Sequence, residues 1–218
     1  MPGAKVPQAV RRKQILAAAY RVAAERGLTG TRIGEVATRA GVSHGLVLFH
    51  FKSKRGLLLA LLEWLLDSTT VLHLGPDISG LASPFDQLRA LLRQEMNRLS
   101  SEPQRTRLMF DYWIASVRDA TIRSKMRTEF ARYRAAFRPV VAAAIAANPV
   151  RFRGVTSAGL AAVSVSFIKG CAVQSMIDLE HFDIAEYVAA AERLMQEVPG
   201  RWHRRPALTR RRATHARG

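Results

Sequence analysis

The chain has 218 residues, with 34 Lys or Arg against 17 Asp or Glu, and a single cysteine. This length suits one or two domains with a sizeable core, and one cysteine excludes an intramolecular disulfide framework, which favours a reducing cytoplasm. The basic N-terminus is not followed by an uninterrupted apolar run, so no signal peptide is expected. The most apolar later segment, residues 155–168, is shorter than the roughly 20 residues that cross a bilayer, so no membrane partner is expected.

The charge is unevenly distributed along the chain. Residues 1–56 hold 11 Lys or Arg and 2 Asp or Glu, residues 57–200 hold 16 and 15, and residues 201–218 hold 7 and none. A basic head before a balanced middle is typical of a DNA-binding domain joined to a domain that does not contact DNA. The alternative, that excess arginine reflects a high-GC genome and serves solubility, explains the tail but not the balanced middle. The expected parts are a disordered basic arm (1–7), a DNA-binding domain (8–56), a helical domain (57–200) and a disordered basic tail (201–218).

The first expected helix covers residues 8–26, because apolar residues recur along one stripe that includes Ile15, Ala19 and Val22. Gly27 ends this helix and residues 28–30 make a turn. Thr31 then caps the next helix, and its hydroxyl is also a candidate for a phosphate contact. Arg32 is free to reach a DNA backbone, with an ordinary solvated arginine as the alternative.

Residues 33–54, IGEVATRAGVSHGLVLFHFKSK, have the pattern of a helix-turn-helix. Apolar residues at spacings of three and four predict a first helix, and Gly41 supplies the left-handed residue that ends it. Ser43 is placed to cap the second helix, and Val47 and Phe51, four apart, anchor that helix inward. A second helix of this kind enters the DNA major groove.

The outer side of the second helix carries an exposed apolar cluster of Leu46, Leu48 and Phe49. A surface Phe or His is by itself unremarkable, but this cluster favours contact with a DNA groove. His44 and Gly45 begin the helix, where backbone N–H groups favour a phosphate.

The segment resembles the DNA-binding domain of the tetracycline-repressor (TetR) family of bacterial regulators. The resemblance rests on Thr31, Val36-Ala37, the turn Ala40-Gly41-Val42-Ser43, and the aromatic end before Lys52-Ser53-Lys54, and it covers roughly residues 8–62 in detail. It implies a cytoplasmic, nucleoid-associated bacterial protein. It also implies base or sugar contacts from His44, Gly45, Leu46 and Phe49 and phosphate contacts from His50 and Lys54. The candidate DNA-binding residues are therefore Thr31, Arg32, Ser43, His44, Gly45, Leu46, Leu48, Phe49, His50, Lys52 and Lys54.

One position departs from the family pattern. A Tyr whose hydroxyl often touches phosphate is common where this chain has Leu48. Leu48 offers only an apolar contact, such as one with a thymine methyl group.

The rest of the chain is also expected to be helical. Helices are predicted over residues 54–72, 85–99, 106–117, 120–147, 155–179 and 184–198, with a loop at 75–84. Asp183 is expected to cap the last of them, and Glu186 follows at the capping-box spacing. No strand-like alternation occurs. The fold class is therefore all-α: a three-helix DNA-binding domain followed by a helical bundle.

Small residues recur every four positions between residues 154 and 177, which lets helices approach closely, and the broad apolar coverage of this segment needs burial on two sides. Core packing within the chain accounts for one side, and a second copy of the chain is a candidate for the other. The family resemblance implies a homodimer formed by the last two helices, which presents two reading helices to a pseudo-palindromic operator. The candidate interface residues are Ala158, Ala162, Ser166, Gly170, Val188, Ala191 and Met195.

Aromatic residues of the helical domain are candidates for a pocket that binds an unknown small-molecule inducer. The resemblance implies the pocket, and residues 111–126 further resemble the choline-responsive betaine regulators of this family, which suggests a quaternary ammonium ligand. The alternative is that the aromatic side chains only fill the core. The candidate pocket residues are Trp64, Phe110, Asp111, Tyr112, Trp113, Phe137, Phe167 and Gln174.

The sequence gives little support to catalysis. It has no HExxH, G-x-S-x-G, P-loop or paired-cysteine metal motif, so no enzyme activity, metal or cofactor is expected. The sequence therefore favours a ligand-releasable repressor of the TetR type that acts as a dimer. The alternative is a basic architectural protein that binds nucleic acid without sequence preference, with strong salt dependence.

Overall fold

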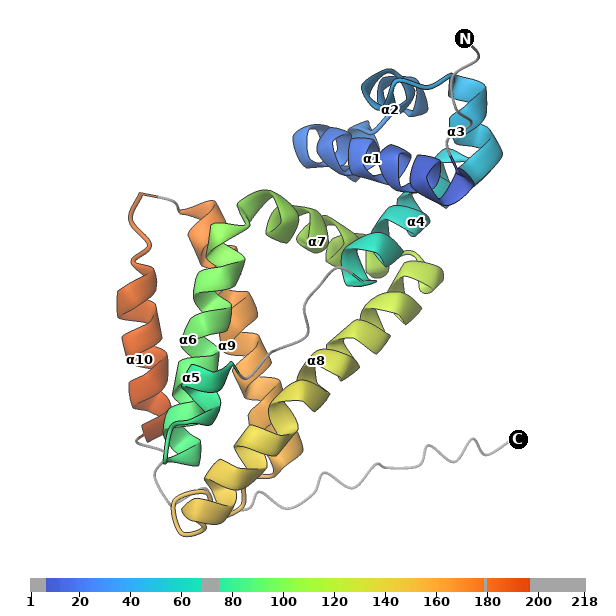
Figure 1. The fold of residues 1–218 in the computed structure, drawn as a ribbon. Coiled ribbons are helices and arrows are strands. Elements are labelled where there is room, and N and C mark those ends of the chain that lie inside the picture. Colours follow the sequence, from blue (N-terminus) through green and yellow to red (C-terminus); the bar gives the residue numbers. More distant parts are fainter. Residues whose placement is uncertain (1–6, 68–74, 179, 197–218) are drawn as a thin grey trace, which may run out of the picture.

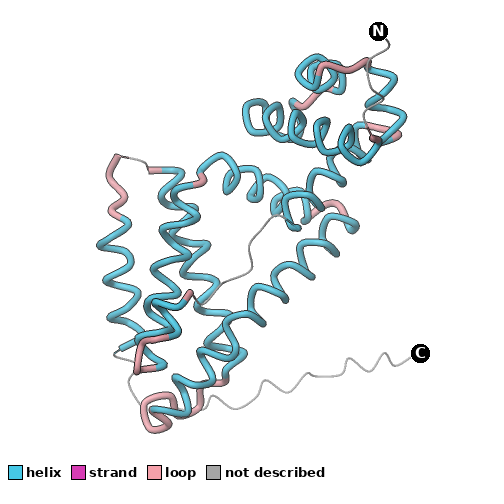
Figure 2. The backbone as a smooth tube through the Cα atoms, viewed as in Figure 1, coloured by secondary structure: helices cyan, strands magenta, loops and turns pink. Residues whose placement is uncertain are grey.

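The computed structural model describes residues 7–67, 75–178 and 180–196, and these contain helices and no strand (Figure 2). The expected all-α class is confirmed. The predicted arm, apart from Pro7, and the predicted tail lie outside the described residues. In chain order the helices are α1 (Gln8–Gly30), α2 (Ile33–Ala40), α3 (His44–Phe51), α4 (Lys54–Asp67), α5 (Pro76–Ser79), α6 (Pro84–Ser101), α7 (Pro103–Ser116), α8 (Ala120–Ala147), α9 (Ser157–Ile177) and α10 (Ile184–Gln196).

Most predicted helices are present, with two differences. Gly27 has φ 71° and ψ 171° and interrupts α1 as expected, but a further helical turn follows and reaches Gly30. The predicted loop at 75–84 contains the short helix α5, because Pro76 suits the first position of a helix, where no N–H is needed. The predicted ends at residues 68–72, 179 and 197–198 lie outside the described residues.

The first core joins α1, α2, α3 and α4, which form one end of the molecule (Figure 1). Leu57, Leu61 and Leu65 of α4 are fully buried in it. Leu108 and Tyr112 of α7 and Met126 of α8 also reach this core. The boundary near residue 56 stays a prediction, because α4 belongs to this core and also leads into the rest of the chain.

The second core lies among α6, α8, α9 and α10, where α6, α9 and α10 lie side by side (Figure 1). Glu192 of α10 is buried, and its carboxylate is 2.8 Å from Arg89 Nη2 and 2.7 Å from Arg93 Nη2, both on α6. Because a buried carboxylate is costly unless it is paired, these contacts fix α10 on α6. Asp183 Oδ1 accepts from the N–H groups of Ala185 and Glu186, as predicted.

Helix α9 is long and apolar enough to cross a membrane by length and composition. It has 21 residues with a hydropathy of 1.5, so the argument that the apolar segment 155–168 is too short to span a bilayer was wrong. The apolar residues Leu160, Val165 and Ile168 instead pack in the second core. Burial in a core accounts for their apolar character without a bilayer.

Candidate nucleic-acid interface and internal cavity

The turn between α2 and α3 has the predicted geometry. Gly41 ends α2 with φ 64° and ψ 37°, in the left-handed region that glycine adopts at small cost. Ser43 is the N-cap of α3, and its Oγ accepts a 3.1 Å hydrogen bond from the N–H of Leu46. The predicted cap is therefore confirmed, and it fixes the direction in which α3 leaves the turn.

Helix α3 divides into an inner and an outer side. Val47 and Phe51 are buried in the first core, whereas His44 and Gly45 are exposed and the Phe49 side chain is 56% exposed. The neighbouring Lys52 ammonium lies 5.4 Å from the centre of the Phe49 ring. The outer side of α3 thus presents a helix N-terminus, an aromatic ring and a cation together, while Leu46, Leu48 and His50 are partly buried beside them.

Thr31 does not cap α2. It is fully buried, and its hydroxyl donates a 2.8 Å hydrogen bond to the carbonyl of Gly27. The residue at the N-cap of α2 is Arg32, which is exposed and makes no side-chain cap bond. The capping prediction was wrong because the end of α1 provides a nearer acceptor, and burial removes the Thr31 hydroxyl from the surface that a phosphate would approach.

Lys54, a predicted phosphate contact, has an internal partner. Its ammonium donates a 2.6 Å hydrogen bond to the carbonyl of Thr29 and so ties the start of α4 to the end of α1. An ammonium has three donors, so this bond leaves others for a phosphate. Ser53 caps α4 by accepting a 3.0 Å hydrogen bond from the N–H of Gly56.

A cavity of about 60 Å³ lies among α6, α7, α8 and α9. It has room for a few water molecules. Its walls combine apolar and aromatic side chains with ionisable groups: Arg98, Leu99, Arg105, Thr106, Met109, Phe110, Trp113, Met126, Glu129, Phe130, Tyr133 and Lys169.

Next to the cavity is an open groove of about 470 Å³ between α8 and α9. Three residues, Trp113, Phe130 and Lys169, line both hollows. They therefore stand between the two. The groove is further lined by Arg134, Ala162, Val165, Ser166, Gly170, Val173 and Gln174.

A buried polar network supports one wall of the cavity. The Glu95 carboxylate is 1% exposed, accepts from Arg98 at 2.7 Å and accepts from the Tyr133 hydroxyl at 2.5 Å. Burial and the Glu95 charge raise the pKa of Tyr133. Burial is the largest single influence on Arg98 and lowers its pKa, but the hydrogen bond to Glu95 and the charge of Glu95 together outweigh burial and raise the pKa of the guanidinium. The Tyr133 hydroxyl and the Arg98 guanidinium therefore both keep their protons near neutral pH.

Lys169 projects its ammonium 5.0 Å from the centre of the Tyr133 ring. Burial, with a smaller contribution from Arg98, lowers the pKa of Lys169 to about 8. The group still carries its charge at pH 7. It therefore places a cation at the boundary between cavity and groove.

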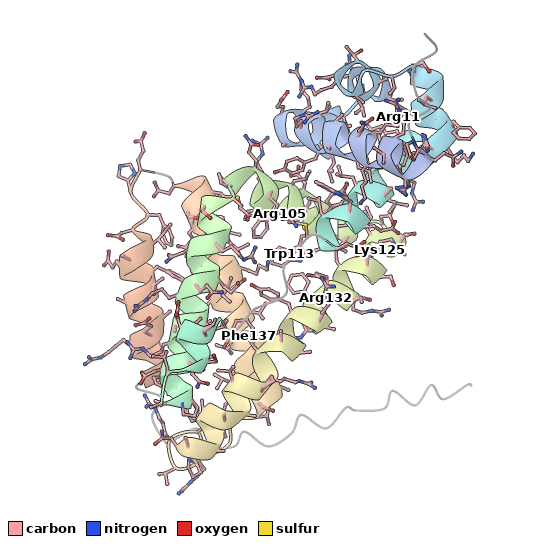
Figure 3. The ribbon with its side chains drawn as sticks, in the orientation of Figure 1. Arg11, Arg105, Trp113, Lys125, Arg132 and Phe137 are labelled. Atoms are coloured by element: carbon pink, nitrogen blue, oxygen red, sulfur yellow. The ribbon has the colours of Figure 1, made fainter. Side chains whose placement is uncertain are left out.

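Two arginines connect the cavity to α4. Arg105 of α7 donates to the carbonyl of Leu65 at 2.6 Å, and Arg132 of α8 donates to the carbonyl of Leu66 at 2.9 Å. Arg132 is also 2.9 Å from Glu129, which lines the cavity. Figure 3 shows Arg105 and Arg132 on the two helices that pass α4. Carbonyls in the last turn of a helix lack intrahelical partners, so these arginines hold the end of α4.

The predicted pocket residues separate into two groups. Phe110 and Trp113 line the cavity and Gln174 lines the groove. The other five do not line either hollow, and for these the prediction was wrong. They are Trp64, Asp111, Tyr112, Phe137 and Phe167.

These five residues have other positions. Tyr112 and Phe137 are fully buried in the cores, and the Tyr112 hydroxyl donates to the Leu58 carbonyl at 2.7 Å. Trp64 packs against Tyr20, 5.8 Å between ring centres. Phe167 of α9 is partly buried against the second core. Asp111 faces α1: its Oδ2 is 3.7 Å from the position that a Cβ atom would occupy if Gly27 carried one.

Family comparison decides the identity of the chain. Residues 15–61 match the model for the bacterial regulatory proteins of the tetR family, and residues 84–199, more than half of the chain, match the C-terminal model of BetI-type transcriptional repressors. The chain belongs to the TetR family. The matched ranges contain the helix-turn-helix and the cavity respectively.

Individual relatives of the TetR family agree with this assignment. The HTH-type transcriptional regulator BetI of Burkholderia ambifaria is 31% identical over 116 residues, and that of Serratia proteamaculans 31% over 118. These matches cover 52% and 50% of this chain, and only 59% and 56% of the relatives.

Solved structures share the fold of this TetR-family chain. A putative regulator from Saccharomonospora viridis in complex with choline has a TM-score of 0.70 at 19% identity, covering 87% of this chain and 97% of that one. The regulator FadR from Bacillus subtilis in complex with stearoyl-CoA has a TM-score of 0.66 at 18% identity, covering 87% and 99%.

The residues proposed for a TetR-type dimer interface lie in different environments. Ala158 and Ser166 are exposed on α9, and Ala162 and Gly170 are partly buried. Val188 and Ala191 are 6% and 4% exposed because they pack inward on α6 and α9, so their assignment to a surface was wrong. The side chain of Met195 lies outside the described part of the chain.

Proposed function

We propose that this chain is a transcriptional repressor that binds operator DNA through α2 and α3 and releases it when a small molecule occupies the helical domain. The division of α3 carries this proposal: Val47 and Phe51 hold the helix on the core, and His44, Gly45 and Phe49 face outward. Family membership supports the same reading. The chain would act in the bacterial cytoplasm on nucleoid DNA, and we infer no enzymatic role.

Contacts with DNA are proposed on both sides of α3. Backbone N–H groups at His44 and Gly45 favour a phosphate, and Phe49 with Leu46 would meet base edges or thymine methyl groups. Arg32, His50, Lys52 and Lys54 would contact the sugar-phosphate backbone, which positions the helix without reading sequence. Leu48 would add an apolar contact.

Dimerisation would bring two copies of α3 onto a pseudo-palindromic site. Support comes from exposed apolar residues on the last two helices, where Val163 of α9 is 47% exposed and Leu194 of α10 is 63% exposed. Ala158 and Ser166 are exposed on the same pair of helices. Small side chains there would let two helices approach closely.

Ligand control would act through α4. Arg105 and Arg132 contact both the cavity region and the last carbonyls of α4, and α4 also belongs to the core beneath α3. A ligand that binds one arrangement of these arginines better than another shifts the population of α4 positions, and hence the spacing of the two reading helices.

Fluorescence anisotropy tests the proposal with the purified chain, its own upstream DNA and a scrambled duplex at two salt concentrations. A preference for one sequence that survives at the higher salt is expected. Equal binding that collapses with salt on every duplex, including fragments selected from the whole genome, would contradict the proposal.

That contradicting result would favour the architectural alternative, which the family comparisons do not support. Deletion of residues 201–218 separates the two. A specific repressor keeps its operator preference, whereas a binder driven by the basic tail loses most of its affinity.

A further inference from the structure

Lys169 has no direct anionic partner at the cavity. Among the described residues its ammonium makes no ion pair and donates no hydrogen bond. It lies 5.0 Å from the centre of the Tyr133 ring, and the carboxylates of Glu95 and Glu129 act on it only through space. A ring face attracts an ammonium but does not neutralise it. A partly buried charge without a counter-ion in contact is costly, so its presence at the edge of two hollows points to a ligand that supplies one.

The carboxylates at the same cavity already have partners. Glu95 accepts hydrogen bonds from Arg98 and Tyr133, and Glu129 pairs with Arg132 at 2.9 Å. Burial also raises the pKa of Glu129, which reduces its capacity to hold a further cation. Because these two carboxylates are paired with arginines, the charge of Lys169 is not cancelled and the lining of the cavity has a net positive charge.

The walls beside Lys169 are aromatic. Trp113 lies 5.5 Å from Phe130 and 5.3 Å from Phe110, measured between ring centres. Trp113 and Phe130 line both cavity and groove, so a flat body that spans the two would lie against these rings with its charged end at Lys169. The small volume of the cavity limits the part of the ligand inside it to a compact group, while the groove holds the rest.

We propose that the ligand is a small organic monocarboxylate with a single aromatic ring or short acyl body, whose carboxylate accepts a hydrogen bond from Lys169. This inference rests on the proposed ligand-responsive repressor. It replaces the quaternary ammonium suggested by the sequence, because Asp111, the one acidic residue among the predicted pocket residues, faces α1 and does not line the cavity. A cation bound here would lie beside Arg98, Arg105 and Lys169, and the one carboxylate that lines the cavity, Glu129, is already paired with Arg132.

Three probes of similar shape test the charge preference: phenylacetate, phenylacetamide and benzyltrimethylammonium. Isothermal calorimetry on the full chain is expected to give binding in that order. Lys169→Met is expected to weaken phenylacetate binding at least about tenfold, the loss typical of a hydrogen bond to a charged group. Lys169→Arg retains the charge and most of the affinity.

Lys125→Met is the matched control, because Lys125 is on α8 but pairs with Glu63 at 2.6 Å, away from the cavity. It should leave phenylacetate binding unchanged. Circular dichroism of each variant shows that it is folded. Three results would each overturn the inference. The first is tighter binding of benzyltrimethylammonium than of phenylacetate, and the second is equal affinity of Lys169→Met and the parent for phenylacetate. The third is no binding of phenylacetate or of any member of a panel of short-chain fatty acids.

DNA anisotropy on the same preparations separates this inference from the proposed function. Specific operator binding without any carboxylate binding refutes the ligand class alone. Lys169-dependent carboxylate binding without any DNA sequence preference supports the ligand site and refutes the repressor.

Discussion

The Arg132 guanidinium donates a 2.9 Å hydrogen bond to the carbonyl of Leu66 and lies 2.9 Å from the carboxylate of Glu129. One residue thus contacts the last turn of α4 and a wall of the cavity. Because α4 also packs in the core that holds α3, a change at Glu129 has a short physical route to α3, the helix proposed to contact DNA. This contact is a local, two-sided link and does not require a long pathway.

Arg132→Ala should weaken the effect of ligand on DNA binding more than it weakens DNA binding itself. The contact is half-exposed, so its loss should cost at most about 1 kcal/mol of stability. The coupling free energy between ligand and operator, about 1–3 kcal/mol in typical cases, should lose most of its value. DNA anisotropy with and without a bound carboxylate measures this coupling free energy. Arg127→Ala, an exposed change on the same helix, should keep the full coupling, and equal coupling in both variants would argue against the link.

Gly56→Ala should strongly destabilise the fold. A Cβ at Gly56 would lie 2.0 Å from the carbonyl oxygen of Phe51, so α3 and α4 would have to separate. Overpacking of this kind costs about 3 kcal/mol. Urea unfolding measures the loss. Gly159 has the same capped position in α9, and its Cβ would meet only the Thr156 hydroxyl at 3.2 Å, so Gly159→Ala should stay within about 1 kcal/mol of the parent. Similar losses in the two variants would contradict the packing argument.

Gly45→Ala should change stability and DNA affinity in opposite directions. The position is helical and exposed, and the nearest atom to an added Cβ is the Ser43 hydroxyl at 4.0 Å. Alanine should therefore raise stability by about 0.5 kcal/mol. If the backbone of α3 lies against DNA, the new methyl group should also lower operator affinity. Gly34→Ala is the control on α2, with comparable space and a smaller expected effect on affinity. Unchanged operator affinity for Gly45→Ala would remove this residue from the interface.

The helix-turn-helix was predictable because its determinants are local. Gly41, Ser43 and the pair Val47 and Phe51 act within one or two helical turns, and all four have the predicted roles. Thr31 failed for a reason outside that range. The kink at Gly27 leaves a carbonyl that accepts both the N–H and the hydroxyl of Thr31, and this competes with the expected cap.

The cavity was only partly predictable. Phe110 and Trp113, three apart on α7, share a face and reach the cavity, whereas Tyr112, next to Trp113, points about 100° away and enters the other core. Helical spacing alone could have excluded Tyr112. Glu95 and Lys169 could have been identified from the sequence, because each is a charged residue within an otherwise apolar helical stripe. Their partners could not be found, because Tyr133 lies 38 residues from Glu95.

The charge of Lys169 should make stability depend on pH in a predictable direction. Burial lowers its pKa from 10.5 to about 8, so between these values the folded chain holds fewer protons than the unfolded chain, and this group makes stability rise with pH. Below pH 8 the partly buried charge lowers the free energy of unfolding, by at most about 3 kcal/mol, and above pH 10.5 that cost disappears. Without ligand, Lys169→Met should therefore be more stable than the parent at pH 7. Loss of the cation–π contact with Tyr133 reduces this gain in stability by about 1 kcal/mol. Urea unfolding at pH 7 and near pH 10 should show that the stability advantage of Lys169→Met shrinks as the pH rises. Lys125→Met is the control: it removes an ammonium that is ion-paired with Glu63, and its stability relative to the parent should not follow this trend. If the variant is no more stable at pH 7, or if its advantage grows toward pH 10, then burial at the cavity does not disfavour the charged form of Lys169.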